Sequence, residues 1–276
     1  MTKKKKVMSK ADSIWSRFRI GESMETAEQK ESPAQLQITL PKKDKSSWLI
    51  NAGVSYRLGD NATSSISKIA TEYHKNTLTD KEQDNFSIGY GLTQLISKNA
   101  SKGFFINGDA KYVYDGVENK NSIVSNMLLT YYKNRNGGPG FNFNSRNICN
   151  GTALFVSAYT GLQLQGAFKA SDNADEGFIL RPQFKTAIHF DINKKDDPIT
   201  PSPLLRFSAD YSGRVDAINT TDNRENYTHL IKTGADIFIA YQPIKVSIGG
   251  SFNYGSNPVV GLKQQEFWLV SLNIMK

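Results

Sequence analysis

The sequence predicts an all-β chain that closes into one antiparallel transmembrane β-barrel of about twelve strands, preceded by a short N-terminal tail. Three observations lead to this prediction. Apolar and polar residues alternate with period two from residue 35 onward, as they do in strands with one apolar face. The alternating runs are about twice as long as the ~5–6 residues of an average strand. Aromatic residues gather toward the ends of the apolar faces, where membrane barrels carry aromatic girdles.

The composition excludes two other classes of protein. With 38 % hydrophobic and 11 % aromatic residues, the chain is too apolar to be disordered. No run approaches the ~20 consecutive apolar residues of a membrane-spanning helix, so a helical membrane protein is excluded as well. Membrane barrels keep a low mean hydropathy because their strands alternate, and the value of −0.46 fits that class.

Residues 1–34 are predicted to form a basic N-terminal tail, and residues 35–276 the barrel. Residues 1–45 carry a net charge of +5 out of the total of +8. The excess charge therefore lies mostly outside the folded part, which disfavours nucleic-acid binding. The alternative to a mobile tail is a short helix docked inside the barrel, with Ile14, Trp15 and Phe18 on one face. No apolar segment follows the basic start, so no secretory signal peptide is visible.

The alternation places the strands one after another along the chain. The clearest run extends from Phe178 to Ile192, where every second residue is apolar except for a proline and a threonine. The first run is short, with Leu36, Ile38 and Leu40 on one face, but the even strand number of bacterial barrels favours including it. The expected strands are 35–41, 47–59, 64–76, 85–96, 103–115, 122–132, 152–168, 177–193, 203–215, 227–241, 244–254 and 266–276.

The connections between these strands predict a rim of short turns opposite a rim of longer, polar loops. Two connections on the short rim, 133–151 and 194–202, are longer than this pattern requires, and the strand count around 133–151 is open. The short turns are 59–61, 97–102 and 242–243, and the longer loops are 78–84, 170–176, 215–226 and 255–265.

The polar face of the strands predicts the lining of the lumen. It carries eight positive and four negative side chains, a net charge of +4. One interpretation is a plugged interior in which these charges form salt bridges; the other is a narrow pore that favours anions. The predicted lumen-lining residues are Arg57, Asp109, Lys111, Arg181, Lys185, His189, Asp191, Arg206, Asp210, Arg214, Lys232, Asp236 and Lys245.

Other classes of function find less support in the residues. A lipid hydrolase needs a histidine paired with a serine or an acid near the outer leaflet. His229 has that place, but the neighbouring strands offer no serine on its face. His74 is expected to be solvated near a strand end. Cys149 is the only cysteine, so no internal disulfide can form, and the sequence offers no Cys/His cluster for a metal. We expect no cofactor and no enzymatic activity. A soluble, lipocalin-like barrel fits the alternation but not the strand length.

The last strand carries the resemblance to a known class. Trp268, Val270, Leu272 and Ile274 alternate as in the C-terminal signal read by the barrel assembly machinery. The segment 35–276 is rich in aromatic residues and asparagine, and with its strand pattern it resembles bacterial outer-membrane β-barrel proteins of the Bacteroidota. A mitochondrial porin of the voltage-dependent anion channel type is similar in length but has nineteen strands.

The resemblance implies a porin-like passive channel for small polar or anionic solutes in the outer membrane of a Gram-negative bacterium. Outer-membrane lipid and the barrel assembly machinery are the expected partners. The alternative is a structural or accessory barrel with a plugged lumen, whose tail contacts a protein partner.

Overall fold

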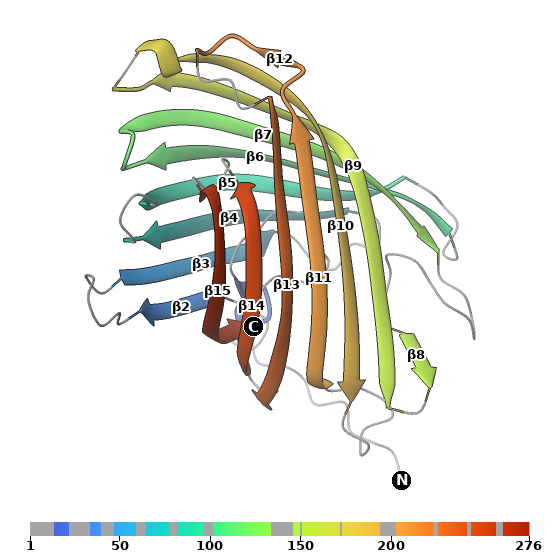
Figure 1. Ribbon diagram of the computed structural model, residues 1–276. Helices are drawn as coiled ribbons and strands as arrows, with labels where there is room; N and C mark the ends of the chain where they lie inside the picture. Colours follow the sequence, from blue (N-terminus) through green and yellow to red (C-terminus); the bar gives the residue numbers. More distant parts are fainter. Residues whose placement is uncertain are drawn as a thin grey trace.

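The computed structural model describes residues 14–21, 34–39, 47–58, 65–77, 82–96, 102–133, 146–149, 151–171, 173–193, 203–222, 226–241, 244–257 and 262–275. Figure 1 shows the strands wrapped around a common interior, with β3 to β7 on one side and β11 to β15 on the other. Among the described residues, no helix is long and apolar enough to cross a membrane.

Twelve antiparallel strands form a nearly closed barrel, which confirms the predicted fold class and strand number. Each strand pairs with the strands that precede and follow it around the ring, and β15 pairs with β2 to close it. The twelve strands are β2 (Ala34–Thr39), β3 (Ser47–Leu58), β4 (Ser65–Asn76), β5 (Gln83–Leu95), β6 (Lys102–Asp115), β7 (Lys120–Lys133), β9 (Thr152–Lys169), β10 (Gly177–Asn193), β11 (Pro203–Val215), β13 (Tyr227–Ala240), β14 (Lys245–Asn257) and β15 (Leu262–Met275).

Three short strands and one short helix complete the structure. β8 (Arg146–Cys149) pairs with the start of β9, and a 3-10 turn η1 (Asn173–Asp175) lies between β9 and β10. β12 (Ile218–Asn219) pairs with β10 beyond the end of β11, and so continues the position of β11 in the sheet. β1 (Phe18–Gly21) pairs with β3.

β1 and β2 share one strand position in the wall. β1 pairs with residues 53–56 of β3, and β2 pairs with residues 47–51 of the same strand, in the same direction. Residues 18–21 therefore belong to the barrel wall, although they lie in the segment 1–34 that was expected to be a tail. The alternative to a mobile tail, a helix docked inside the barrel, is not what residues 18–21 form. Residues 1–13 and 22–33 lie outside the described residues.

The two ends of the barrel are named here by the chain ends. The terminal rim is the end at which β1 begins and β15 stops; the distal rim is the opposite end. The longest connection, 134–151 with β8, lies at the terminal rim, as the exception noted in the prediction has it. A short, four-residue turn at 116–119 lies at the distal rim.

The polarity of the barrel is inverted relative to a soluble protein. More than twice as many polar or charged residues as hydrophobic ones are buried among the described residues. The large hydrophobic side chains are instead exposed on the outer face of nearly every strand, with Met127 55 % and Trp268 78 % exposed. Strand alternation explains the division, because successive side chains point to opposite faces.

Candidate functional site: the inner face of the barrel

The thirteen residues predicted to line the lumen all alternate with the exposed apolar positions, and so lie on the inner face. Lys111, Arg181, Asp191 and Arg214 are buried there, whereas Lys245 is exposed at the terminal rim. The other members are half-buried: Arg57, Asp109, Lys185, His189, Arg206, Asp210, Lys232 and Asp236.

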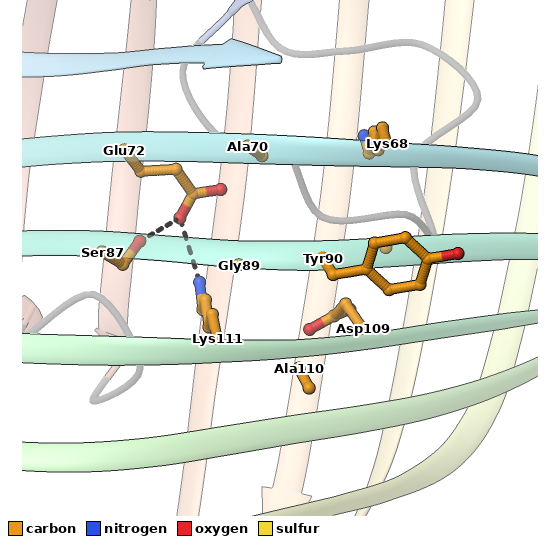
Figure 2. A pocket seen from close by; sticks show the side chains of 10 residues that line it. Lys68, Ala70, Glu72, Ser87, Gly89, Tyr90, Asp109, Ala110 and Lys111 are labelled. Atoms are coloured by element: carbon orange, nitrogen blue, oxygen red, sulfur yellow. Dashed lines mark hydrogen bonds and ion pairs between the residues drawn. The ribbon is translucent and has the colours of Figure 1, made fainter. Parts of the chain in front are cut away.

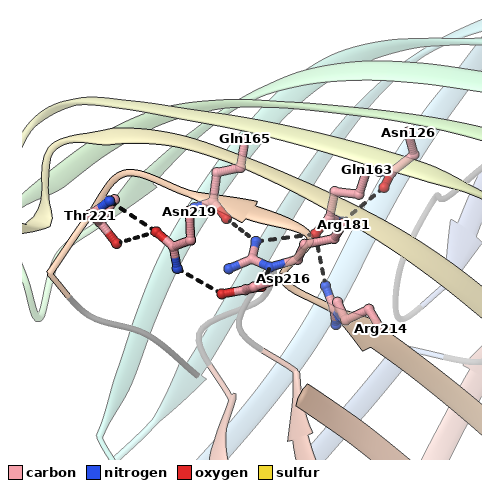
Figure 3. A network of polar contacts seen from close by, with 8 residues as sticks. All are labelled: Asn126, Gln163, Gln165, Arg181, Arg214, Asp216, Asn219 and Thr221. Atoms are coloured by element: carbon pink, nitrogen blue, oxygen red, sulfur yellow. Dashed lines mark hydrogen bonds and ion pairs between the residues drawn. The ribbon is translucent and has the colours of Figure 1, made fainter. Parts of the chain in front are cut away.

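Arg181 of β10 is the centre of a polar network near the distal rim (Figure 3). Its Nε donates to Asp216 at 2.5 Å, and its Nη1 donates to Gln165 at 2.5 Å and to Gln163 at 3.3 Å. Arg214 donates to the same Gln163 oxygen at 3.1 Å. Two guanidinium groups therefore share one amide oxygen, and the Arg181 group also lies in an ion pair with Asp216.

The network continues across the neighbouring strands through Asn126 of β7. Its side-chain oxygen accepts from Gln163 at 2.8 Å and from Gln183 at 3.2 Å. Its amide nitrogen donates to Asp109 of β6 at 2.8 Å. A continuous chain of hydrogen bonds thus runs along the wall from β6 to β11, and its members hold one another in fixed orientations.

A second cluster lies on β4, β5 and β6 (Figure 2). The Lys111 ammonium lies 3.0 Å from Glu72, which also accepts a hydrogen bond from Ser87 at 3.2 Å. Glu72 and Lys111 come from strands separated by β5, and they meet because Gly89 lies between them. A Cβ at Gly89 would stand 2.6 Å from the Cβ of Lys111. Glu72 was not among the predicted lumen residues.

Two of the three histidines belong to the inner face. His74 is only 4 % exposed, its Nδ1 lies 3.0 Å from the Asn51 oxygen, and its Nε2 lies 3.8 Å from Glu72. The expectation that His74 is solvated is therefore wrong, because β4 turns this side chain inward. His189 Nε2 lies 3.2 Å from Asp210.

His229 lies on the outer face, as its place in the alternation predicts. It stacks on Tyr227 with ring centroids 5.4 Å apart, and the tilted Tyr254 ring lies at the same distance. Gly213 is its partner on β11. The contacts of His229 are thus aromatic.

Near the terminal rim, Arg206 and Asp191 form a bidentate ion pair. The Nε and Nη2 of Arg206 donate to the two carboxylate oxygens at 2.7 and 3.0 Å, and the guanidinium lies over the Phe238 ring at 5.4 Å. Pairs of this geometry are among the strongest in proteins. Asp236 accepts a hydrogen bond from Asn273 at 2.6 Å.

The contacts described above follow the wall of the barrel. Each joins strands that are neighbours or next-but-one neighbours in the ring. Twelve strands spaced ~4.8 Å apart and tilted by ~40° give a backbone diameter of about 24 Å. This is wider than the eight-stranded barrels whose interior side chains fill completely. The polar contacts therefore stabilise the inner face without reaching across the central axis.

The inner face keeps an excess of positive charge. The structure adds Arg19 of β1 and Lys68 of β4 to the predicted cations, and Glu72 and Asp216 to the anions. Asp115 and Lys120 also lie on the inner face near the distal rim, and cations stay in excess over anions on this face. Within the described part of the chain, no group of three or more His, Cys, Asp or Glu side chains could hold a metal ion. No protein-family model and no curated protein matches the sequence.

Proposed function

We propose that this protein is an outer-membrane β-barrel of a Gram-negative bacterium, and that it acts as a narrow passive channel for small polar or anionic solutes. One observation carries the proposal: the barrel exposes its apolar residues and buries its polar ones. In water, contiguous exposed apolar patches larger than a few hundred Å² are rare on a monomer. In a bilayer, the same outer face is the lipid contact that a spanning barrel requires.

The aromatic side chains support a membrane position. Outward-facing rings lie near both rims, as in the two interfacial girdles of membrane barrels. Those near the distal rim are Tyr114, Phe168, Phe178, Tyr227 and Tyr254, and those near the terminal rim are Phe104, Tyr131 and Phe207. Trp15 is 63 % exposed beside the start of β1, and its ring lies tilted against that of Phe18 with the centroids 5.6 Å apart.

The charge and the width of the interior support a channel that favours anions. An uncompensated excess of Arg and Lys along a pore attracts anions into it. The polar contacts described above follow the wall, and the backbone diameter of about 24 Å is wider than that of the eight-stranded barrels whose side chains fill the interior.

Two measurements test the proposal in order. A heat-modifiable band in the outer-membrane fraction is expected on a gel run with and without boiling, and a soluble band with no mobility shift contradicts the membrane assignment. In planar bilayers, discrete conductance steps with an anion preference are expected.

Substitution of the inner cations tests the anion preference. Lys185→Glu combined with Lys232→Glu changes two half-buried side chains of the inner face, and should lower the anion-to-cation permeability ratio. Lys102→Glu makes the same kind of change on the outer side of the terminal rim, and should leave the ratio unchanged. A heat-modifiable barrel without conductance would instead indicate the accessory, plugged barrel.

A further inference from the structure

The charges of the barrel are divided unevenly between its two ends. Among the described residues within four positions of a strand end, or in the adjoining turns, the terminal rim carries nine cations and two anions. The cations are Arg17, Arg19, Arg57, Lys68, Lys102, Lys133, Arg146, Arg206 and Lys245, and the anions are Asp191 and Asp236.

The distal rim has the opposite sign. By the same criterion it carries ten anions and seven cations. The anions are Glu72, Glu82, Asp84, Asp115, Glu118, Asp175, Glu176, Asp216, Asp222 and Glu266; the cations are Lys75, Lys111, Lys120, Lys169, Arg181, Arg214 and Lys263. By sequence, the strand connections outside the described residues, with Lys276, add a net charge of +2 at the terminal rim and +1 at the distal rim. The segment 22–33, which joins β1 to β2, adds −3, so the difference between the rims remains whichever rim this segment adjoins.

The side chains at each rim strengthen this contrast. At the distal rim, the cations Lys111 and Arg181 lie in ion pairs with Glu72 and Asp216. At the terminal rim, Arg19 and Lys245 are exposed, and the buried Nε of Arg57 has no hydrogen-bond partner. Arg206 lies in an ion pair with Asp191 at this rim, so the positive charge that the terminal mouth presents to the lumen is that of the exposed Arg19 and Lys245.

The two mouths act as electrically separate regions. Strands of 12–14 residues, with ~3.3 Å per residue and a tilt of ~40°, separate the rims by about 30–35 Å. The screening length is ~10 Å at 0.1 M salt, so neither mouth feels much of the field of the other. Each mouth then gathers its own counterions: anions at the terminal rim and cations at the distal rim.

We infer that the barrel is a rectifying channel, which conducts more current when the distal side is positive. The inference rests on the proposed channel function. With the distal side positive, cations enter through the acidic mouth and anions through the basic mouth, so both ions accumulate in the lumen. With the opposite polarity, each ion must enter through the mouth that repels it, and the lumen is depleted of carriers.

The test is the current–voltage curve of single channels in symmetric KCl. Orientation is read from the variant Val117→Cys in a Cys149→Ser background: the exposed thiol at the distal turn is biotinylated, and streptavidin is added to one side. A ratio of about two to three between the currents at opposite voltages is expected at ~0.1 M KCl, falling to about one at ~1 M as the screening length shortens to ~3 Å.

A pair of variants assigns the effect to the terminal mouth. Arg19→Glu with Lys245→Glu reverses two exposed charges on the inner side and should lower the current ratio toward one. Lys102→Glu lies at the same rim on the outer side and should retain it. A symmetric curve at ~0.1 M in a conducting channel overturns the rectification alone. The same ratio in the Arg19/Lys245 variant overturns its assignment to this mouth. The absence of any conductance overturns the channel function itself.

Discussion

The ion pair between Lys111 and Glu72 gives the most direct test of how the inner face is stabilised. Both side chains are more than nine-tenths buried, at 8 % and 5 % exposure. Lys111→Met keeps a long unbranched side chain that fits beside Gly89, but leaves the Glu72 carboxylate with Ser87 at 3.2 Å and His74 at 3.8 Å. Loss of one partner of a buried pair costs ~3–5 kcal/mol. Because Ser87 still donates to Glu72, we expect a decrease of about 3 kcal/mol in the free energy of unfolding.

The assay is equilibrium unfolding in urea in lipid vesicles, followed by tryptophan fluorescence and by gel mobility. The control is Lys111→Met combined with Glu72→Gln, which removes the buried charge and should restore stability to within ~1 kcal/mol of the original protein. A decrease of less than ~1 kcal/mol in the single variant is the value of a solvated pair. That result would refute the reasoning, because it would mean that lumen water hydrates Glu72.

Three further substitutions test the wall. Gly161→Ala places a Cβ against the backbone oxygen of Met127 and should destabilise the barrel by about 1–3 kcal/mol, whereas Gly166→Ala on the same strand meets no atom within 4 Å and should be tolerated in the same urea series. Arg206→Lys loses the two-pronged bond to Asp191 and should cost about 1–2 kcal/mol; an unchanged midpoint would contradict that role. Met127→Lys, at the middle of the outer face of β7, should cost ~2–4 kcal/mol in a bilayer; no loss in vesicles would argue against lipid contact there.

The strands could be predicted because their signal is local. Period-two alternation needs only the residues of one segment, and it places most strand ends within two residues of those in the structure. β1 was missed because its four residues, Phe18 to Gly21, are too short to show a period. Nothing in that segment indicates that β3 has a free position beside residues 53–56, since that depends on where β2 begins.

The inner contacts were less accessible to sequence reasoning. On β4, the outward positions Thr71 and Lys75 are polar, so the alternation does not reveal that Glu72 and His74 point inward. The pair between Glu72 and Lys111 joins residues 39 positions apart, and it depends on the register of two successive hairpins. Patterns within one segment carry no information on such registers.

The junction between β15 and β2 has a consequence for how the barrel assembles. Every other junction between the twelve strands of the ring joins strands that follow one another in the ring and along the chain, so it can form as a hairpin while the rest of the chain is still unfolded. Among the described residues, the closing junction consists of three residue pairs, which run from Leu36 with Leu272 to Ala34 with Ile274. Closing a loop that contains almost the whole chain carries the largest entropic cost and slows folding. Ring closure is therefore the last step, and the assembling protein passes through an open, curled sheet whose two free edges are the first and last strands.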